Sequence, residues 1–191
     1  TFVQVVEINA AVPPLAKAHF GFKAPGVEIT IADGRQFLND GEGSYDAVIL
    51  DVFLGDSSPS HLLTKEAFES MRQSLEPQGV LVINCFAEFE LGSDFFASTL
   101  QHVFRSVVAH SDGAGALFFV ASDRTNLRPV RAIEFSAAHP DLVAAANIAF
   151  TNVVNPARLN GVLLTDDFNP IEFYDARIRE GIRRDFALGA P

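Results

Sequence analysis

The stretch VEITIADGRQFLNDGEGSYDAVILD, residues 27–51, contains two apolar runs separated by a short polar segment. Residues 27–32 are predicted to form a strand, residues 34–39 a short helix, and residues 47–50 the next strand. A strand, a helix and a second strand in this order are typical of parallel strands joined by a crossover connection. The stretch therefore predicts an α/β fold.

The same alternation continues on both sides of this stretch. Upstream, we expect a strand at residues 2–8 and a helix at residues 12–20. Downstream, we expect a helix that Thr64 caps and that a Pro-Gln-Gly break at residues 77–79 ends. The inner face of this helix is expected to carry Ala67, Phe68, Met71 and Leu75.

The remaining elements complete a mostly parallel sheet, covered by helices on both faces, that closes in an antiparallel hairpin. We expect a strand at 80–85, a helix at 94–104, antiparallel strands at 106–110 and 116–122, a helix at 140–150, a short strand and turn at 163–174, and a helix at 176–186. The length fits a single domain over residues 1–191, with a less regular part at residues 123–191.

Composition narrows the possible functions. The chain carries 14 Lys and Arg against 24 Asp and Glu, a formal net charge of −10, which argues against nucleic-acid binding and fits a cationic or neutral small substrate. The only cysteine, Cys85, excludes a disulfide framework, and the five histidines lack metal-ligand spacing. No apolar run of the sequence reaches the length of a membrane span. We expect a cytoplasmic protein without a bound metal.

Acidic residues close the first three predicted strands: Glu7, Asp33 and Asp51. In an open α/β sheet, ligands bind beyond the carboxyl ends of the strands. A carboxylate there can accept both hydroxyls of a ribose, or the amino group of an adenine. Each of the three could instead cap a helix or form a turn, as Asp33 before Gly34 could. Because all three close strands of one sheet, they favour an adenosine-bearing ligand.

Five segments, in this order, resemble the spermidine synthases, which are polyamine aminopropyltransferases, and most closely their bacterial spermidine-synthase-like branch. They are VVEINAAV (5–12), IADGRQFL (31–38), YDAVILDVFLGD (45–56), HLLTKEAFESMRQSLEPQGVLVIN (61–84) and LLTDDFNPIEFYD (163–175). The resemblance implies the Rossmann-like fold of class I S-adenosylmethionine-dependent transferases. It also implies a homodimer that moves an aminopropyl group from decarboxylated S-adenosylmethionine to a diamine such as putrescine.

Residue by residue, the resemblance implies that Glu7, beside Ile8, holds the ribose hydroxyls. It implies that Asp33 holds the adenine, with Gly34 allowing close approach. Asp51 would be the catalytic carboxylate, near the aminopropyl group and the attacking amine. A carboxylate there can bind an ammonium ion, orient it and accept the proton that the amine must lose before attack.

Other positions depart from the family. The second Asp of the family's catalytic loop usually comes three residues after the first, whereas here Asp56 follows Asp51 by 56 − 51 = 5 residues. Asp56 is therefore either the ligand of the substrate amine or a solvated turn residue. Asp166 and Asp167 fall in a segment that matches the family's C-terminal pattern, and we expect them to close the domain structurally.

The family also has a first strand and a Gly-rich loop for which the sequence before Phe2 has no counterpart. In the family's strand order, this strand lies between the strands that end here at Glu7 and Asp51. Without it, the sheet would have a gap in its middle. We therefore expect residues 1–191 to be N-terminally incomplete and to bind the adenosine ligand weakly by themselves. Micromolar binding of methylthioadenosine to the isolated 191 residues would contradict this expectation.

Two other functions stay open. A class I methyltransferase that uses S-adenosylmethionine itself would share the fold, with Asp51 as a substrate ligand. A non-catalytic relative would bind a nucleoside without turnover. Asp51 and Asp56 together favour aminopropyl transfer, because methyl transfer does not require two carboxylates at that place. Incubation with putrescine and either form of the cofactor would separate these functions.

Overall fold

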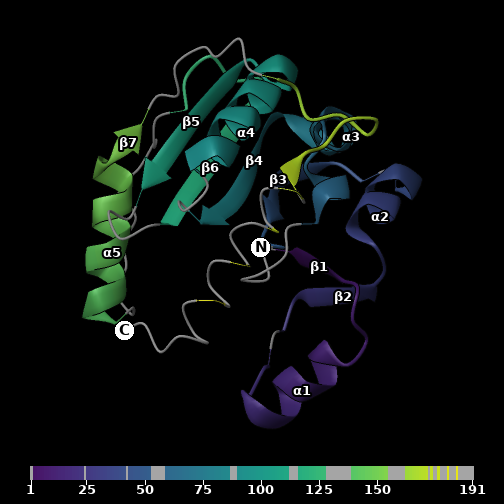
Figure 1. Ribbon diagram of the computed structural model, residues 1–191. Coiled ribbons are helices and arrows are strands. Elements are labelled where there is room, and N and C mark those ends of the chain that lie inside the picture. The colour runs from purple at the N-terminus through teal and green to yellow at the C-terminus, as the bar shows by residue number, and fades with distance from the viewer. Residues whose placement is uncertain are drawn as a thin grey trace. The chain divides into compact units, whose positions relative to one another are not determined.

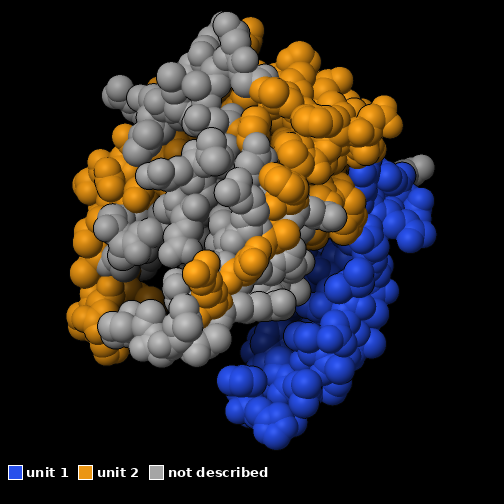
Figure 2. Space-filling view, viewed as in Figure 1, with its two compact units in different colours: residues 1–43 blue, residues 44–191 orange. Residues whose placement is uncertain are grey.

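The computed structural model describes most of the chain and divides it into two compact units, residues 1–43 and residues 44–191 (Figure 2). The described residues are 2–23, 25–41, 43–52, 59–86, 90–111, 116–127, 139–154 and 162–171, together with 173, 176, 180 and 184. The expectation of one domain over residues 1–191 stays a prediction.

The first unit contains a pair of parallel strands and two helices (Figure 1). Strand β1 (Val3–Glu7) pairs with β2 (Val27–Ile31), from Val3 beside Val27 to Glu7 beside Ile31. Helix α1 (Val12–His19) joins them, with its prolines in the first turn as a helix tolerates, and α2 (Gly34–Asp40) follows β2. The expected strands and helices of this part are confirmed.

The burial expected of a sheet that helices cover on both faces is not found in this unit. Val3 and Val5 of β1 are 43% and 38% exposed, and neither α1 nor α2 has a buried residue. The reason is that a pair of strands gives each strand only one neighbour, so two helices have little sheet to cover.

The second unit is built on a five-stranded mixed sheet with the order β3-β4-β6-β5-β7 (Figure 1). Strand β3 (Tyr45–Leu50) is parallel to β4 (Leu75–Phe86). Strand β6 (Ala116–Ser122) runs antiparallel to both β4 and β5 (Ser106–Ser111), which confirms the predicted hairpin, and β7 (Val153–Val154) adds a short edge.

The boundary between α3 (Lys65–Gln73) and β4 differs from the prediction. Thr64 caps α3 as expected, and Ala67, Phe68 and Met71 are buried on its inner face. Leu75, however, already belongs to β4 and pairs with Tyr45, whereas the next pair joins Ala47 to Val80. The Pro-Gln-Gly stretch at residues 77–79 is therefore an irregularity inside the strand, not the break that ends the helix. A bulge accommodates a proline that a regular ladder would exclude.

The core of the second unit lies where α3 and α4 (Glu90–Val103) meet the sheet. Phe68 of α3 is fully buried, and Phe96 of α4 stacks on Phe119 of β6 with ring centroids 6.5 Å apart. Helix α4 begins four residues earlier than predicted, at Glu90 rather than at residue 94. Aromatic packing of this kind stabilises a fold by burial and by ring–ring contact.

The C-terminal third is described in part. Helix α5 (Pro140–Thr151) confirms the helix predicted at residues 140–150. The strand predicted within residues 163–174 is wrong for the part that the structure describes, because residues 162–170 there form neither strand nor helix. Their backbone groups bond instead to side chains and to a helix end. The helix predicted at residues 176–186 lies mostly outside the described residues.

Two sheet edges have no partner strand in the described ranges. There β1 pairs only with β2, and β3 pairs only with β4. The strand expected between these two edges stays a prediction. Within the described residues, no helix is both long enough and apolar enough to cross a membrane.

Candidate functional site

Asp51 stands directly beyond the carboxyl end of β3. Because Leu50 pairs with Ile83 in the parallel ladder, the residues that follow them, Asp51 and Asn84, lie side by side. The side-chain amide Nδ2 of Asn84 donates a hydrogen bond to Oδ1 of Asp51 over 3.0 Å. Asp51 is exposed, so its carboxylate is both oriented and accessible to a ligand.

Sequence reasoning missed Asn84. The signal was present, because Asn84 is the polar residue at the end of an apolar run, VLVIN, and carboxyl ends of neighbouring parallel strands share an edge of the sheet. What the sequence could not supply was the pairing of β3 with β4 and its register.

The chain that leaves Asp51 returns to the described part at Pro59. There η1, a short 3-10 helix (Ser60–Leu62), leads into Thr64, the cap of α3. Leu62, Leu63 and Thr64 are 6%, 0% and 1% exposed, so residues 62–64 are packed into the core. Asp56, predicted as the ligand of the substrate amine, lies outside the described residues, and its role stays a prediction.

Residues 162–171, near the C-terminal end of the chain, pack against residues 60–65. The hydroxyl of Thr64 donates to Oδ1 of Asp166 over 2.7 Å, and the N–H of Lys65 donates to the carbonyl of Leu164 over 2.7 Å. The amide Nδ2 of Asn169 donates to the carbonyl of Ser60 over 2.8 Å. These contacts fit the expectation that Asp166 closes the domain structurally, and the role of Asp167 stays a prediction.

Glu7 and Ile8 lie at the carboxyl end of β1 in the first unit. Oε1 of Glu7 accepts the N–H of Asn9 over 2.8 Å, and Oδ1 of Asn9 in turn accepts the N–H of Ala11 over 3.0 Å. Ile8 is 71% exposed. The Glu7 carboxylate therefore forms the turn after β1 through one oxygen, and its other oxygen has no hydrogen bond to any described residue.

Asp33 caps α2, which is the local role that the sequence left open. Its Oδ1 accepts the N–H groups of Arg35 and Gln36 over 3.0 and 2.9 Å. At Gly34 an added Cβ would have no atom of the described chain within 4 Å, and the backbone there does not require glycine. This leaves room for close approach of a ligand.

The predicted site residues thus fall into two sets. Glu7, Ile8, Asp33 and Gly34 belong to the first unit, and Asp51 with Asn84 belongs to the second. Within each set the residues lie at or just beyond carboxyl ends of parallel strands. No group of three His, Cys, Asp or Glu residues that could hold a metal ion occurs among the described residues.

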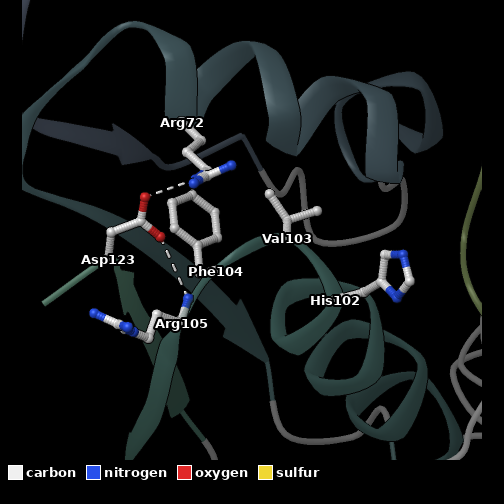
Figure 3. Close-up of a pocket in the computed structure, with 6 residues that line it drawn as sticks. All are labelled: Arg72, His102, Val103, Phe104, Arg105 and Asp123. Carbon is white, nitrogen blue, oxygen red and sulfur yellow. Dashed lines mark hydrogen bonds and ion pairs between the residues drawn. The ribbon is translucent and has the colours of Figure 1, made fainter. Parts of the chain in front are cut away.

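A pocket of about 440 Å³ lies at the end of the second sheet that is opposite to Asp51, near the amino end of β4 (Figure 3). Since β6 is antiparallel to β4, Asp123, which follows β6, lies near the amino end of β4, away from Asp51. The pocket is lined by Arg72, His102, Val103, Phe104, Arg105 and Asp123.

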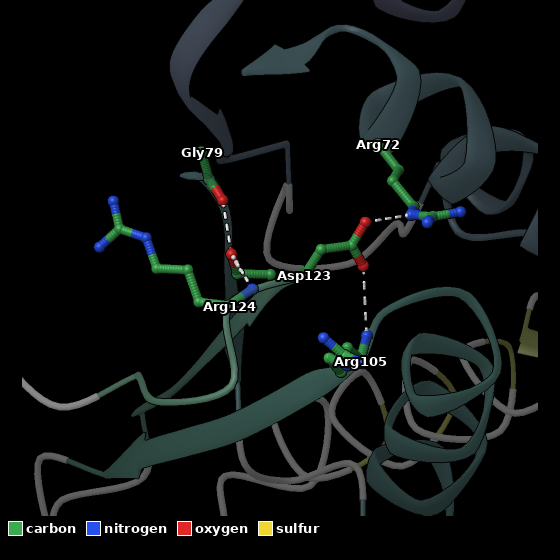
Figure 4. Close-up of polar contacts among 6 residues, drawn as sticks. Arg72, Gly79, Arg105, Asp123 and Arg124 are labelled. Carbon is green, nitrogen blue, oxygen red and sulfur yellow. Dashed lines mark hydrogen bonds and ion pairs between the residues drawn. The ribbon is translucent and has the colours of Figure 1, made fainter. Parts of the chain in front are cut away.

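The charged groups that line this pocket have structural partners within the protein, so they give no sign of a ligand site (Figure 4). Asp123 Oδ2 pairs with Nε of Arg72 over 2.7 Å, and its Oδ1 accepts the N–H of Arg105 over 3.4 Å. Next to it, the buried Ser122 hydroxyl donates to the carbonyl of Gly79 over 2.6 Å and accepts the N–H of Arg124. Asp123 thus connects the end of α3 to the start of β5. The candidate site of the second unit therefore remains at the carboxyl end of β3, at Asp51.

Chemically, the two sets offer different functions. The first offers two carboxylates beyond strand ends, one of them next to Gly34, which suits the hydroxyls and the amino group of a nucleoside. The second offers one exposed carboxylate fixed by an amide, which suits a cationic amine that must be oriented and deprotonated.

Comparison with known proteins identifies the family to which the chain is similar. The family model described as "Spermine/spermidine synthase domain" matches residues 4–110, more than half of the chain. A polyamine aminopropyltransferase of Vibrio vulnificus is 32% identical over 106 residues, which cover 53% of this chain and 35% of that protein. The chain therefore spans about a third of the length of this curated relative.

Solved structures agree on the fold. The crystal structure of a probable spermidine synthase from Corynebacterium glutamicum has 26% identity and a TM-score of 0.57, and the match covers 76% of this chain and 53% of that one. Human methyltransferase-like protein 13, solved in complex with SAH, has 23% identity and a TM-score of 0.54, over 79% of this chain and 70% of that one. Both confirm the predicted class I methyltransferase-like fold.

Proposed function

Because the chain belongs to the spermine/spermidine synthase family, we propose that the protein carrying it is an aminopropyltransferase. Its proposed reaction moves an aminopropyl group from decarboxylated S-adenosylmethionine to a diamine such as putrescine. The observation that carries this proposal is the exposed carboxylate of Asp51, which Asn84 orients at the carboxyl end of β3.

In the proposed reaction, the amine nitrogen of the diamine attacks the methylene carbon next to the sulfonium. A nitrogen–carbon bond forms, the sulfur–carbon bond breaks with its electron pair passing to sulfur, and methylthioadenosine leaves as a neutral thioether. The attacking group arrives as an ammonium ion and must first lose a proton. We assign the acceptance of that proton to Asp51, which also neutralises the cation while it is bound.

The adenosine part of the co-substrate is assigned to the first unit. In this proposal Glu7 accepts the ribose hydroxyls through the oxygen that does not bond Asn9, beside Ile8. Asp33 accepts the adenine amino group, and the open space at Gly34 admits the ring. Asp56 is proposed as a second ligand of the amine, on the strength of the family pattern alone.

Asp51 and Asp56 together favour aminopropyl transfer over methyl transfer, because methyl transfer does not require two carboxylates at that place. The experiment is an incubation of the protein with putrescine and either decarboxylated S-adenosylmethionine or S-adenosylmethionine. The proposal expects turnover with the decarboxylated form only. Consumption of S-adenosylmethionine alone would instead support a methyltransferase, and tight methylthioadenosine binding without turnover a non-catalytic relative.

We further propose, from the family, that the protein is a cytoplasmic homodimer. Sedimentation velocity of the purified protein tests the assembly, with a dimer mass expected and a monomer mass at micromolar concentration contradicting it. Fractionation of the source cells tests the location.

A further inference from the structure

We propose that Phe118 and His110 determine which amine the protein accepts: the ring of Phe118 binds the far end of the amine, and His110 limits its length. The inference rests on the proposed function, because it takes Asp51 as the place where the attacking nitrogen is held. It deepens that function by adding a subsite for the part of the amine that does not react. The residues that carry it all belong to the described part of the second unit.

A row of side chains crosses the sheet next to Asp51. Asn84, which bonds the Asp51 carboxylate over 3.0 Å, pairs with Phe118 of β6, and Phe118 pairs with His110 of β5 (Figure 1). Residues that lie directly opposite each other in antiparallel strands have their side chains on the same face of the sheet. The side chains of Asn84, Phe118 and His110 therefore form one row that begins at Asp51.

The face that carries this row is not the face that α4 covers. The neighbouring residues on the same strands, Ile83, Phe119 and Ala109, pair with one another, point to the opposite face and are 0%, 3% and 3% exposed. Phe96 of α4 stacks on that face. The three residues of the row are only half-buried. The row therefore has surface for a ligand, whereas its reverse side is core.

His110 lies at the far end of the row. Its ring meets the ring of Phe150 of α5 edge to face, with ring centroids 6.4 Å apart and planes at 70°. On its other side, His110 pairs with Val153 of β7, the last strand of the described sheet. An edge-to-face contact favours one orientation of the ring. His110 therefore closes the row with a ring that is held in place.

The length of the row matches putrescine. Neighbouring strands lie about 4.8 Å apart, so the backbones at Asp51 and His110, three strands apart, are separated by about 14 Å. A bound ammonium lies about 3 Å from its carboxylate, and a ligand atom in contact with a ring lies about 4 Å from it. Subtracting both distances leaves about 7 Å for the amine. An extended chain advances about 1.2 Å per bond, so the outer nitrogens are about 6 Å apart in putrescine and about 11 Å apart in spermidine.

Phe118 lies where the far nitrogen of putrescine arrives. Its backbone is two strands from Asp51, at about 10 Å, and a putrescine held at Asp51 places its far nitrogen about 9 Å along the row. The face of a phenyl ring attracts a cation within about 6 Å of its centroid, and the methylene groups bury apolar surface against it. Phe118 therefore favours a diamine over a monoamine with the same carbon chain.

Phe118→Leu tests the contact with the far nitrogen, because it keeps an apolar side chain and removes the ring. The acceptors are putrescine and butylamine, which has the same carbon chain and one nitrogen. KM for putrescine should rise about fivefold with kcat within about twofold, and KM for butylamine should change by less than about twofold. Phe118→Tyr keeps the ring and should keep the unaltered KM. Phe173→Leu, at a position 64% exposed, is the matched control. An unchanged putrescine KM in Phe118→Leu would overturn the contact.

His110→Ala tests the limit on length. Without the ring the row is longer, so kcat/KM for spermidine as the acceptor should rise about tenfold while kcat/KM for putrescine stays within about threefold. His102→Ala is the matched control, because His102 is exposed and lies near the end of α4, and it should change neither value. An unchanged ratio of spermidine to putrescine turnover in His110→Ala would overturn the limit.

Binding measurements distinguish a failure of this inference from a failure of the proposed function. If the unaltered protein has no turnover, aminopropyl transfer fails, and calorimetric titration with putrescine still tests the row. Putrescine should then bind the unaltered protein about fivefold more tightly than it binds Phe118→Leu. Equal affinities, or no binding of putrescine to the unaltered protein, would overturn the inference. Equal turnover in the unaltered protein and in all variants would overturn the inference and leave the proposed function standing.

Discussion

Replacing Asp51 with asparagine removes a charge while keeping the local geometry. Nδ2 of Asn84 donates to Oδ1 of Asp51 over 3.0 Å, and an amide oxygen in the same place accepts the same bond. What is lost is the negative charge that we propose to lie beside the ammonium substrate, together with the proposed acceptor of its proton. A positioned general base contributes about 100- to 10,000-fold to a rate, or about 3–5 kcal/mol of transition-state stabilisation. We therefore expect kcat of Asp51→Asn to fall by that factor.

The assay is the initial rate of methylthioadenosine formation at saturating decarboxylated S-adenosylmethionine and putrescine. Asp46→Asn is the matched control, since Asp46 is also exposed and lies at the other end of β3, about 16 Å away at the rise of a strand. It should keep kcat within about twofold. If Asp51→Asn also keeps its turnover within about threefold, then Asp51 is not the proton acceptor and the reasoning from the strand edge is refuted.

The remaining predictions concern glycines and a cap. Gly34→Ala should leave the free energy of unfolding unchanged, because the added Cβ meets open space. The same variant should weaken methylthioadenosine binding at least about tenfold in calorimetry. Unaltered binding would show that no ligand approaches Gly34. Gly79→Ala should do the reverse and cost about 1–3 kcal/mol in urea unfolding, because its Cβ would lie 2.9 Å from the carbonyl oxygen of Tyr45; a stable variant would contradict that close approach. Thr64→Val should lower the free energy of unfolding by about 2 kcal/mol, since it loses both the cap of α3 and the bond to Asp166. Thr64→Ser keeps both contacts and should lower it by less than about 1 kcal/mol. Equal losses in the two variants would count against the role of the hydroxyl.

Local chemistry made much of the fold predictable. The cap at Thr64 is a signal that acts within one turn, and it correctly marked the start of α3. The hairpin of β5 and β6 is also a local pairing. The β4 start could not be predicted, because only pairing with Tyr45 makes residues 75–79 part of a strand.

The candidate site was predictable at the strand ends and unpredictable where tertiary contacts decide. Asp51 and Glu7 could be placed because a carboxylate that closes an apolar strand is conspicuous in a sequence. Asn84 and Phe118 could not, because their places depend on which strands lie beside β3 and β4. A single sequence holds no direct signal for contacts between residues far apart in the chain.

Glu7 and Asp33 show why a local role and a ligand role are hard to separate. Both carboxylates accept backbone N–H groups of the next turn, as the structural interpretation of the sequence required. Such a bond also fixes the carboxylate for a ligand, so the same residue type fits both readings. Binding measurements, rather than further sequence reasoning, decide between them.

The central claim is that this protein transfers an aminopropyl group, and the products of one reaction test it most directly. The protein is incubated with ¹⁵N-labelled putrescine and decarboxylated S-adenosylmethionine. The products are then separated by chromatography and identified and quantified by mass spectrometry. The account predicts labelled spermidine and methylthioadenosine in equal amounts, each dependent on both substrates. Absence of labelled spermidine, together with a methylated product when S-adenosylmethionine is supplied instead, would contradict it.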